Sequence, residues 1–316
     1  MLSRVAFFFG FIIVMFAARG APVCAQVRHE YSEVHMGMPV RIVLFAATDS
    51  AAGSAARAAF QHIARLDDDL TDYRPVSELR KIEAHAGDWV SVKPSTFIVL
   101  ARAIEIAQRT DGAFDPTIGP VVTLWRAARR AHRLPDRAAL DSARALVSYK
   151  WLLLDSARNA VRLHRAGMRL DLGGIAKGFI LQQALATLER NGVTRALLEA
   201  GGDIVVGAPP PAQPGWRIDV PGADSSFQAA AAKLTHSALA TSGPSEQYLE
   251  IGGTRYSHVV DPRTALGLTN RITVHTIASD GATADALATA LTVIGRDRAS
   301  TILARFPGIL ASTRKN

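Results

Sequence analysis

Cysteine is almost absent from this chain, whose 316 residues contain a single one, Cys24. One cysteine cannot form an intramolecular disulfide, and it excludes zinc sites that are built from several cysteines. The nine histidines are scattered and form no HExxH pair, so a zinc protease site of that kind is excluded as well. Stability and metal binding must therefore depend on other side chains.

Several familiar enzyme motifs are also missing. No serine lies in a GxSxG sequence, which excludes the usual nucleophile turn of α/β-hydrolases. The glycines at 173 and 174 belong to neither a GxGxxG pattern nor a P-loop, because no GK[ST] sequence follows them. No repeat of fixed period and no long Ser-, Gly- or Pro-rich linker divides the chain, which favours a single catalytic domain.

The one long apolar run, "VAFFFGFIIVMFAA", lies near the N-terminus between a basic residue and small residues that end at Ala25. This layout is typical of a secretory signal peptide, and the run is shorter than the roughly 20 residues that cross a membrane. We expect residues 1–25 to be a signal peptide, residues 26–316 to form the functional domain, and the mature protein to be exported to the periplasm. The alternatives are an uncleaved anchor and an inner-membrane lipoprotein attached through Cys24.

The formal net charge is +8, and many arginines lie in the segment "WRAARRAHRLPDR", residues 125–137. A basic helix can contact nucleic acid or anionic lipid. We favour a solvated helical face instead and expect no nucleic-acid partner. A basic surface also suits an anionic cofactor.

The order of the elements indicates an α+β fold with a mixed sheet, because strand-to-strand hairpins alternate with helices. Apolar residues at every second position predict strands over residues 38–46, 147–155, 160–164, 168–172, 195–208, 216–220, 247–251, 255–260 and 271–278. Apolar residues three and four apart predict helices over residues 51–70, 95–110, 179–190 and 283–294, and a last helix that ends at 302.

The segment "GATADALATALTVIG" places Asp285 and Thr289 four residues apart, on the same face of a helix. A carboxylate and a hydroxyl are hard oxygen ligands of the kind that magnesium prefers. The alternative is that Asp285 interacts with the helix dipole while Thr289 bonds to the backbone. The spacing alone favours that structural interpretation.

The segment "RLDLGGIAKGF" has Asp171 at the end of an apolar stretch, followed by two glycines at the start of a helix. Backbone N–H groups at a helix start attract phosphate, but a tight turn capped by Asp171 explains the same residues equally well. Asp203 in "EAGGDIVVGAP" would either bind a sugar hydroxyl or cap a turn, and Thr241, Ser242 and Gly243 in "ATSG" would form either an oxyanion-type or phosphate-contacting loop or a simple turn.

The segment "YSHVVDPRTALGL" carries His258 on a strand and Asp261 at the start of a proline turn. It reads either as an ordinary hairpin strand or as a turn that holds a histidine over a substrate. The spacing alone favours the ordinary strand.

Eight blocks of the chain, taken in order, resemble the ApbE family, the FAD:protein FMN transferases. The blocks are "HMGMPVRIVLF", "DYRPVSEL", "GAFDPTIGPVVTLW", "LDLGGIAKGF", "LLEAGGDIVVGA", "ATSG", "YSHVVDPRTA" and "TADALATALTVIG". The resemblance extends from about Met36 to the end and implies a T-fold-like, ApbE-like α+β domain.

The resemblance also implies an activity. The protein would bind FAD, use Mg²⁺, and transfer the FMN half of FAD to a Thr or Ser hydroxyl of an acceptor protein with release of AMP. The acceptors would be subunits of membrane redox pumps or other exported flavoproteins. Two other activities suit the same fold: a magnesium-dependent FAD pyrophosphatase that gives FMN and AMP, and a non-catalytic exported flavin-binding protein.

The resemblance assigns roles to particular residues. His258 corresponds to the general base, which suits the ordinary histidine pKa of about 6.5, and Asp261 would either orient its ring or cap the turn. The flavin-contacting positions are Met36, Tyr73, Ala113, Phe114, Asp115, Asp171, Lys177 and Val259. The magnesium ligands are the carbonyl of Gly174 and the side chains of Asp285 and Thr289.

The chain departs from the family pattern in three places. Ala265 lies where the family has the glycine of "DPRTG", and Met38-Pro39 replaces a more usual threonine. The segment "LWRAARRAHR", residues 124–133, replaces one that contains glycine. None of these changes removes an implied ligand.

Overall fold

The fold is given by a computed structural model, which describes residues 26–220, 223, 227–228, 231, 233–243 and 248–315. The expected signal peptide, residues 1–25, and the alternative lipid site at Cys24 lie outside the described residues.

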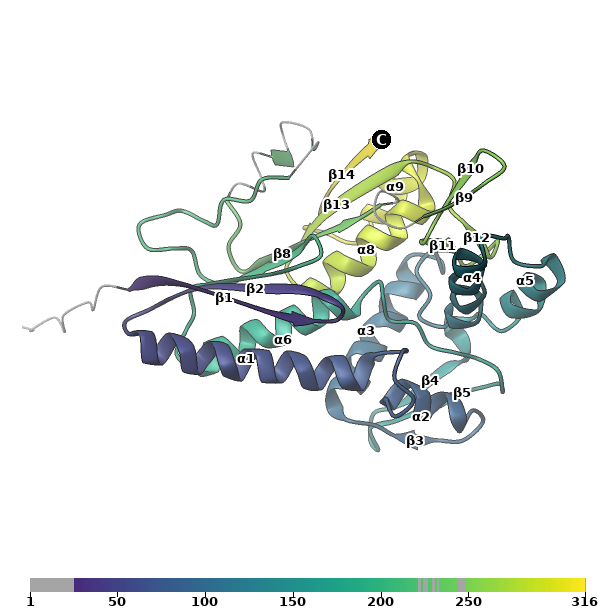
Figure 1. Ribbon diagram of the computed structural model, residues 1–316, viewed down its shortest axis with the longest axis horizontal. Coiled ribbons are helices and arrows are strands. Elements are labelled where there is room, and N and C mark those ends of the chain that lie inside the picture. The colour runs from purple at the N-terminus through teal and green to yellow at the C-terminus, as the bar shows by residue number, and fades with distance from the viewer. Residues whose placement is uncertain are drawn as a thin grey trace, which may run out of the picture.

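A seven-stranded sheet forms the centre of the fold (Figure 1). Across the sheet its strands are β1 (Val27–His35), β2 (Met38–Ala46), β6 (Ala196–Ala200), β7 (Asp203–Val206), β8 (Ser237–Ser242), β13 (Ile272–Ala278) and β14 (Leu310–Lys315). Every ladder between these strands is antiparallel. The α+β class is therefore confirmed, and the expected mixed sheet proves to be antiparallel.

Strand β2 shows how the sheet separates two cores. Val40, Ile42 and Leu44 are buried in the main core, whereas Val43 is buried with Trp216 in a smaller core on the other face. Successive side chains of a strand point to opposite faces. The alternation in "MPVRIVLFA" thus corresponds to two buried faces.

Helices α1 (Asp49–Leu70), α6 (Ala176–Arg190) and α8 (Gly281–Ile294) cover the main-core face of the sheet, and α3 (Pro94–Arg109) packs on α8 (Figure 1). Helix α1 begins at the N-cap Thr48, whose hydroxyl accepts a hydrogen bond from Ala51 N. No helix among the described residues has the length and apolarity needed to cross a bilayer.

Helices α6 and α8 touch at two glycines. A Cβ on Gly178 would lie 2.0 Å from Gly281 O, and a Cβ on Gly281 would lie 2.1 Å from Gly178 O. Only residues without a side chain allow such an approach. The contact brings Lys177 of α6 close to Asp285 of α8.

Smaller elements surround the sheet and its helices. The helical ones are α2 (Glu78–Ala84), α4 (Gly119–Ala131), α5 (Arg137–Arg144), α9 (Arg296–Leu303) and the 3₁₀ turn η1 (Tyr149–Trp151). A three-stranded sheet is formed by β3 (Val90–Ser91), β5 (Ala160–Leu163) and β4 (Leu152–Asp155). Two hairpins pair β9 (Tyr248–Ile251) with β10 (Thr254–Ser257) and β11 (Val260–Asp261) with β12 (Leu266–Gly267).

The expected hairpin at "IGGT" is confirmed, since Gly252 and Gly253 have φ of +57° and +75° between two paired strands. The strand expected over residues 168–172 is wrong, because this segment forms only an isolated bridge at Arg169. Its alternating apolar side chains are buried in the main core, so the period of two reflects burial without a ladder. Similarly, residues 216–220 form only an isolated bridge at Trp216.

Candidate active site

A large cavity of about 1540 Å³ lies over the N-terminal ends of α6 and α8. Its lining comes from the β1–β2 turn, the loop after α1, helix α4, the ends of β7 and β8, and the turn between β10 and β11. The cavity lining includes every site residue implied by the resemblance: Met36, Tyr73, Ala113, Phe114, Asp115, Asp171, Gly174, Lys177, His258, Val259, Asp285 and Thr289. The fold thus gathers residues that are widely separated in the sequence.

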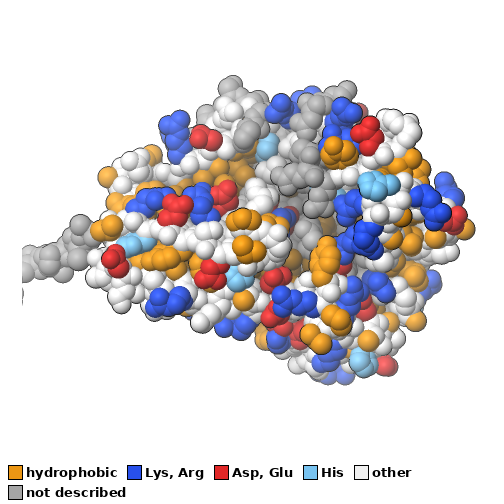
Figure 2. Space-filling view, viewed as in Figure 1, with side chains coloured by type: hydrophobic (Ala, Val, Ile, Leu, Met, Phe, Trp, Pro, Cys, Tyr) orange, Lys and Arg blue, Asp and Glu red, His pale blue; other side chains and the backbone are white. Residues whose placement is uncertain are grey.

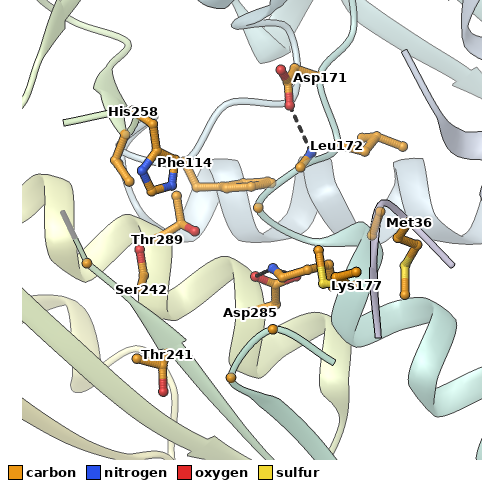
Figure 3. Close-up of a pocket in the computed structure, with 18 of the residues that line it drawn as sticks. Met36, Phe114, Asp171, Leu172, Lys177, Thr241, Ser242, His258, Asp285 and Thr289 are labelled. Carbon is orange, nitrogen blue, oxygen red and sulfur yellow. Dashed lines mark hydrogen bonds and ion pairs between the residues drawn. The ribbon is translucent and has the colours of Figure 1, made fainter. Parts of the chain in front are cut away.

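Lys177 forms the charged centre of the cavity together with two aspartates. Its Nζ lies 3.0 Å from Asp203 Oδ2 and 3.2 Å from Asp285 Oδ1, and Figure 3 shows Lys177 and Asp285 side by side. Burial alone would lower the pKa of Lys177, but the two carboxylates outweigh it and raise that pKa. Burial, reinforced by the charge of Asp285, raises the pKa of Asp203 to about 7. The lysine is therefore firmly cationic.

Asp285 and Thr289 lie one helical turn apart on α8, and Thr289 faces the backbone of Gly174. A Cβ on Gly174 would lie 2.9 Å from Thr289 Oγ1, so the peptide of Gly174 is next to that hydroxyl. A carboxylate, a hydroxyl and a carbonyl are hard oxygen donors that suit magnesium, which keeps water or phosphate in its remaining positions. This donor set fits the implied metal, although the described residues include no cluster of three His, Cys, Asp or Glu side chains.

Asp171 is held at both carboxylate oxygens. Its Oδ1 accepts a hydrogen bond of 2.8 Å from Gly173 N, and its Oδ2 accepts one of 2.9 Å from Arg126 Nη2. The turn cap considered for this aspartate is thus present, yet its second oxygen is engaged at the cavity. Burial raises the pKa of Asp171 even though the Arg126 cation opposes that shift.

Asp115 lines the cavity, but its carboxylate is occupied by hydrogen bonds to neighbouring segments of the chain. It accepts hydrogen bonds from the N–H and the hydroxyl of Thr117 and from Tyr149 N, at 2.8, 2.6 and 2.9 Å. Burial raises the pKa of this carboxyl. A contact from Asp115 to a flavin would therefore involve its backbone more readily than its side chain.

His258 lies in the turn between β10 and β11, exposed at the cavity wall. Figure 3 shows its ring grouped with Phe114 and Thr289. The backbone N–H of Val259 donates to Ser257 Oγ at 3.1 Å, which fixes the turn. The histidine therefore faces the same space as the candidate metal ligands.

The carboxylate of Asp261 accepts hydrogen bonds from the backbone N–H and the guanidinium of Arg263, at 2.8 to 2.9 Å. Of the two roles considered for Asp261, these contacts support the turn cap. Ala265 in the same turn has φ of +60°, a left-handed conformation in which the family's glycine is easier to accommodate.

Three residues have roles in the cavity that the sequence alone does not reveal. Arg126 contacts Asp171, although its segment was expected to be a solvated face. Asp203, which was left ambiguous, pairs with Lys177. Asp67 accepts a 2.9 Å hydrogen bond from Met36 N and so holds the β1–β2 turn against the cavity. A pattern of spacing within one segment gives no signal for such contacts between distant segments.

Known proteins resemble this chain in sequence and in fold. The model of the ApbE family matches residues 36–312. The FAD:protein FMN transferase of Klebsiella pneumoniae (strain 342) is 32% identical over 275 residues, which cover 85% of this chain and 84% of that protein. The crystal structure of the ApbE protein of Thermotoga maritima has a TM-score of 0.79 and 29% identity, covering 92% of this chain and 97% of the other. The flavin transferase ApbE of Vibrio cholerae has a TM-score of 0.75 and 25% identity, with coverage of 92% and 97%.

Proposed function

The chain belongs to the ApbE family, and from this premise we propose that it is a transferase that moves FMN from FAD to a hydroxyl of an acceptor protein. The acceptor residue is a Thr or Ser, and AMP is the second product. The observation that carries the proposal is the convergence of His258, Lys177, Asp285 and Thr289 on one cavity.

The residues have complementary tasks in this reaction. The acceptor hydroxyl attacks the FMN phosphorus, a new P–O bond forms, and the bond to the AMP phosphate breaks. His258 takes the proton of the attacking hydroxyl as general base, and the Lys177 cation offsets negative charge near the phosphates. Asp285, Thr289 and the Gly174 carbonyl would hold Mg²⁺, which when bound neutralises phosphate oxygens.

The setting of the reaction is also part of the proposal. The N-terminal leader supports export to the periplasm, with attachment to the inner membrane through Cys24 as the alternative. The acceptors are then exported flavoproteins or the periplasm-facing subunits of membrane redox pumps.

The direct test incubates the protein with FAD, Mg²⁺ and an acceptor fragment that contains one candidate threonine. We expect the fragment to gain the mass of FMN, AMP to appear in equal amount, and His258→Ala and Asp285→Ala to abolish both signals. Release of AMP without labelled fragment would indicate the FAD pyrophosphatase instead. FAD that stays intact in the presence of Mg²⁺ and acceptor would indicate a flavin-binding protein.

A further inference from the structure

Helix α4 carries a row of arginines that differ in their surroundings. Figure 2 shows Lys and Arg side chains gathered on the surface around this helix. Arg130 and Arg133 are exposed, whereas the side chain of Arg126 is only 19% exposed and lines the cavity. Arg126 therefore does not belong to the solvated face that the sequence suggested for this segment.

The guanidinium of Arg126 joins two segments of the cavity wall. One Nη donates to the carboxylate of Asp72, in the loop after α1, and the other donates to Asp171 Oδ2 at 2.9 Å. Both carboxylates are largely buried, with side-chain exposures of 13% and 10%. Two such carboxylates facing one site repel each other unless a cation lies between them. Arg126 is that cation.

The same guanidinium lies over an aromatic ring. Its central carbon is 4.5 Å from the ring centre of Tyr73, which is within the range of a cation–π contact. Tyr73 nevertheless remains 75% exposed and lines the cavity. With one face covered by Arg126, the opposite face of the ring is available to stack on a planar ring system.

The loop that carries Tyr73 has other attachments. Arg80 donates to the backbone carbonyl of Asp72, and Ser77 N donates to Arg74 O at 3.2 Å. The loop therefore stays connected to α2 when Arg126 is changed. What Arg126 adds is the link from this loop to Asp171.

We propose that Arg126 is a positioning residue for FAD, which holds the Tyr73 ring and the Asp171 carboxylate in the arrangement that receives the dinucleotide. The inference rests on the proposed function, and it concerns this chain in particular, because its arginine-rich segment lies where the family it resembles has a glycine-bearing one. Arg126 acts through its two neighbours and takes no part in the transfer of the phosphoryl group.

The proposal predicts a separation of KM from kcat. Arg126→Met leaves two carboxylates without their cation and frees the Tyr73 ring, so the KM for FAD rises roughly 30-fold or more, by the usual effect of breaking a buried charge pair. The kcat at saturating FAD changes less than about 3-fold, because no reacting group is lost. Arg126→Lys keeps the charge without the planar fork and recovers only part of the affinity.

Arg130→Met is the matched control, since it removes an exposed arginine from the same helix. It should leave both constants unchanged. Asp72→Asn removes one of the two ion pairs and should raise the KM for FAD by a smaller factor, and it replaces Arg126→Met if that variant does not fold. Circular dichroism and thermal melting confirm that each compared variant is folded.

A second measurement tests whether Arg126 acts through Tyr73. In a Tyr73→Leu background, Arg126→Met should raise the FAD dissociation constant, followed by flavin fluorescence, by a clearly smaller factor than in the wild type. Equal KM for Arg126→Met, Arg130→Met and wild type would overturn the inference, as would a fall in kcat alone. Failure of the wild type to bind or transfer flavin would instead contradict the proposed function.

Discussion

The ammonium group of Lys177 lies 3.2 Å from one carboxylate oxygen of Asp285 and 3.3 Å from the other. The lysine implied to contact FAD and the aspartate implied to hold the metal thus form one charge pair. A cation bound by Asp285 must share this carboxylate with Lys177, so binding of the metal and the position of the lysine are coupled.

Asp285→Asn should reduce the response to magnesium. The change removes the only charged group of the candidate metal ligands but keeps the size of the side chain, so the metal loses its strongest attraction. We expect the Mg²⁺ concentration for half-maximal transfer to rise at least about 10-fold, because even the loss of a residue that only orients a metal ligand lowers metal affinity about 10-fold or more. The control is Asp141→Asn on the exposed face of α5. An unchanged magnesium midpoint would refute this assignment.

Asp203 should make stability depend on pH. Burial raises its pKa from the ordinary value of 3.8 to about 7 in the folded protein, so between these values the folded state binds more protons than the unfolded state. The contribution of Asp203 to the unfolding free energy therefore falls as the pH rises from about 4 to 7. We expect the difference in unfolding free energy between wild type and Asp203→Asn to decrease across this window in urea titrations. A difference that stays constant, or grows with pH, would show that Asp203 ionises normally in the fold.

Gly178→Ala should destabilise the fold by about 3 kcal/mol or more, at the upper end of overpacking effects. The new Cβ would lie 2.0 Å from the carbonyl oxygen of Gly281. Because this oxygen belongs to the backbone of α8, it cannot rotate away as a flexible side chain could. The matched control is Gly53→Ala in α1, whose Cβ would lie 3.3 Å from the flexible end of Arg57. That control should stabilise the protein by up to about 1 kcal/mol through helix propensity. Equal urea midpoints for the two variants would contradict the close contact of α6 and α8.

Ala265 should tolerate glycine and reject branched side chains. Relief of its left-handed conformation is worth about 1 kcal/mol, and loss of its buried methyl group costs about 0.8 kcal/mol, so Ala265→Gly stays within about 1 kcal/mol of wild type. Ala265→Val combines positive φ with a β-branched side chain and should cost more than about 2 kcal/mol. Thermal melting of both variants tests the difference. A valine variant as stable as the glycine variant would show that the turn adopts another conformation.

Much of the cavity could be anticipated because its residues lie in short blocks whose order along the chain is distinctive. The block "DLGGIAKG" carries Asp171, Gly174 and Lys177, and all three line the cavity. The strands of the sheet interior could also be predicted from the sequence, because burial on one or both faces leaves a pattern of apolar residues. Strand β1 left no such pattern, since this edge strand exposes most of its side chains.

Contacts between distant segments could not be predicted from the sequence. Periodicity places Arg126 on a helix, but only the packing of α4 against the loop after α1 turns it toward Asp72 and Tyr73. The wrong prediction of a strand over residues 168–172 has the same cause. Alternation of apolar and polar residues indicates burial, but it does not show whether a hydrogen-bonded partner strand lies alongside.

The hairpin of β1 and β2 also determines how far the start of β1 lies from the cavity. Met36 at its tip lines the cavity, while Val27 begins the other end of β1. Nine residues of antiparallel strand extend about 30 Å, so Val27 lies about that far from Met36 and the part of the cavity that Met36 lines (Figure 1). An attachment at this end of β1, whether to a lipid or to a laboratory support, would leave the cavity unobstructed. The cavity could then reach acceptor proteins within a radius of about 30 Å of the attachment point.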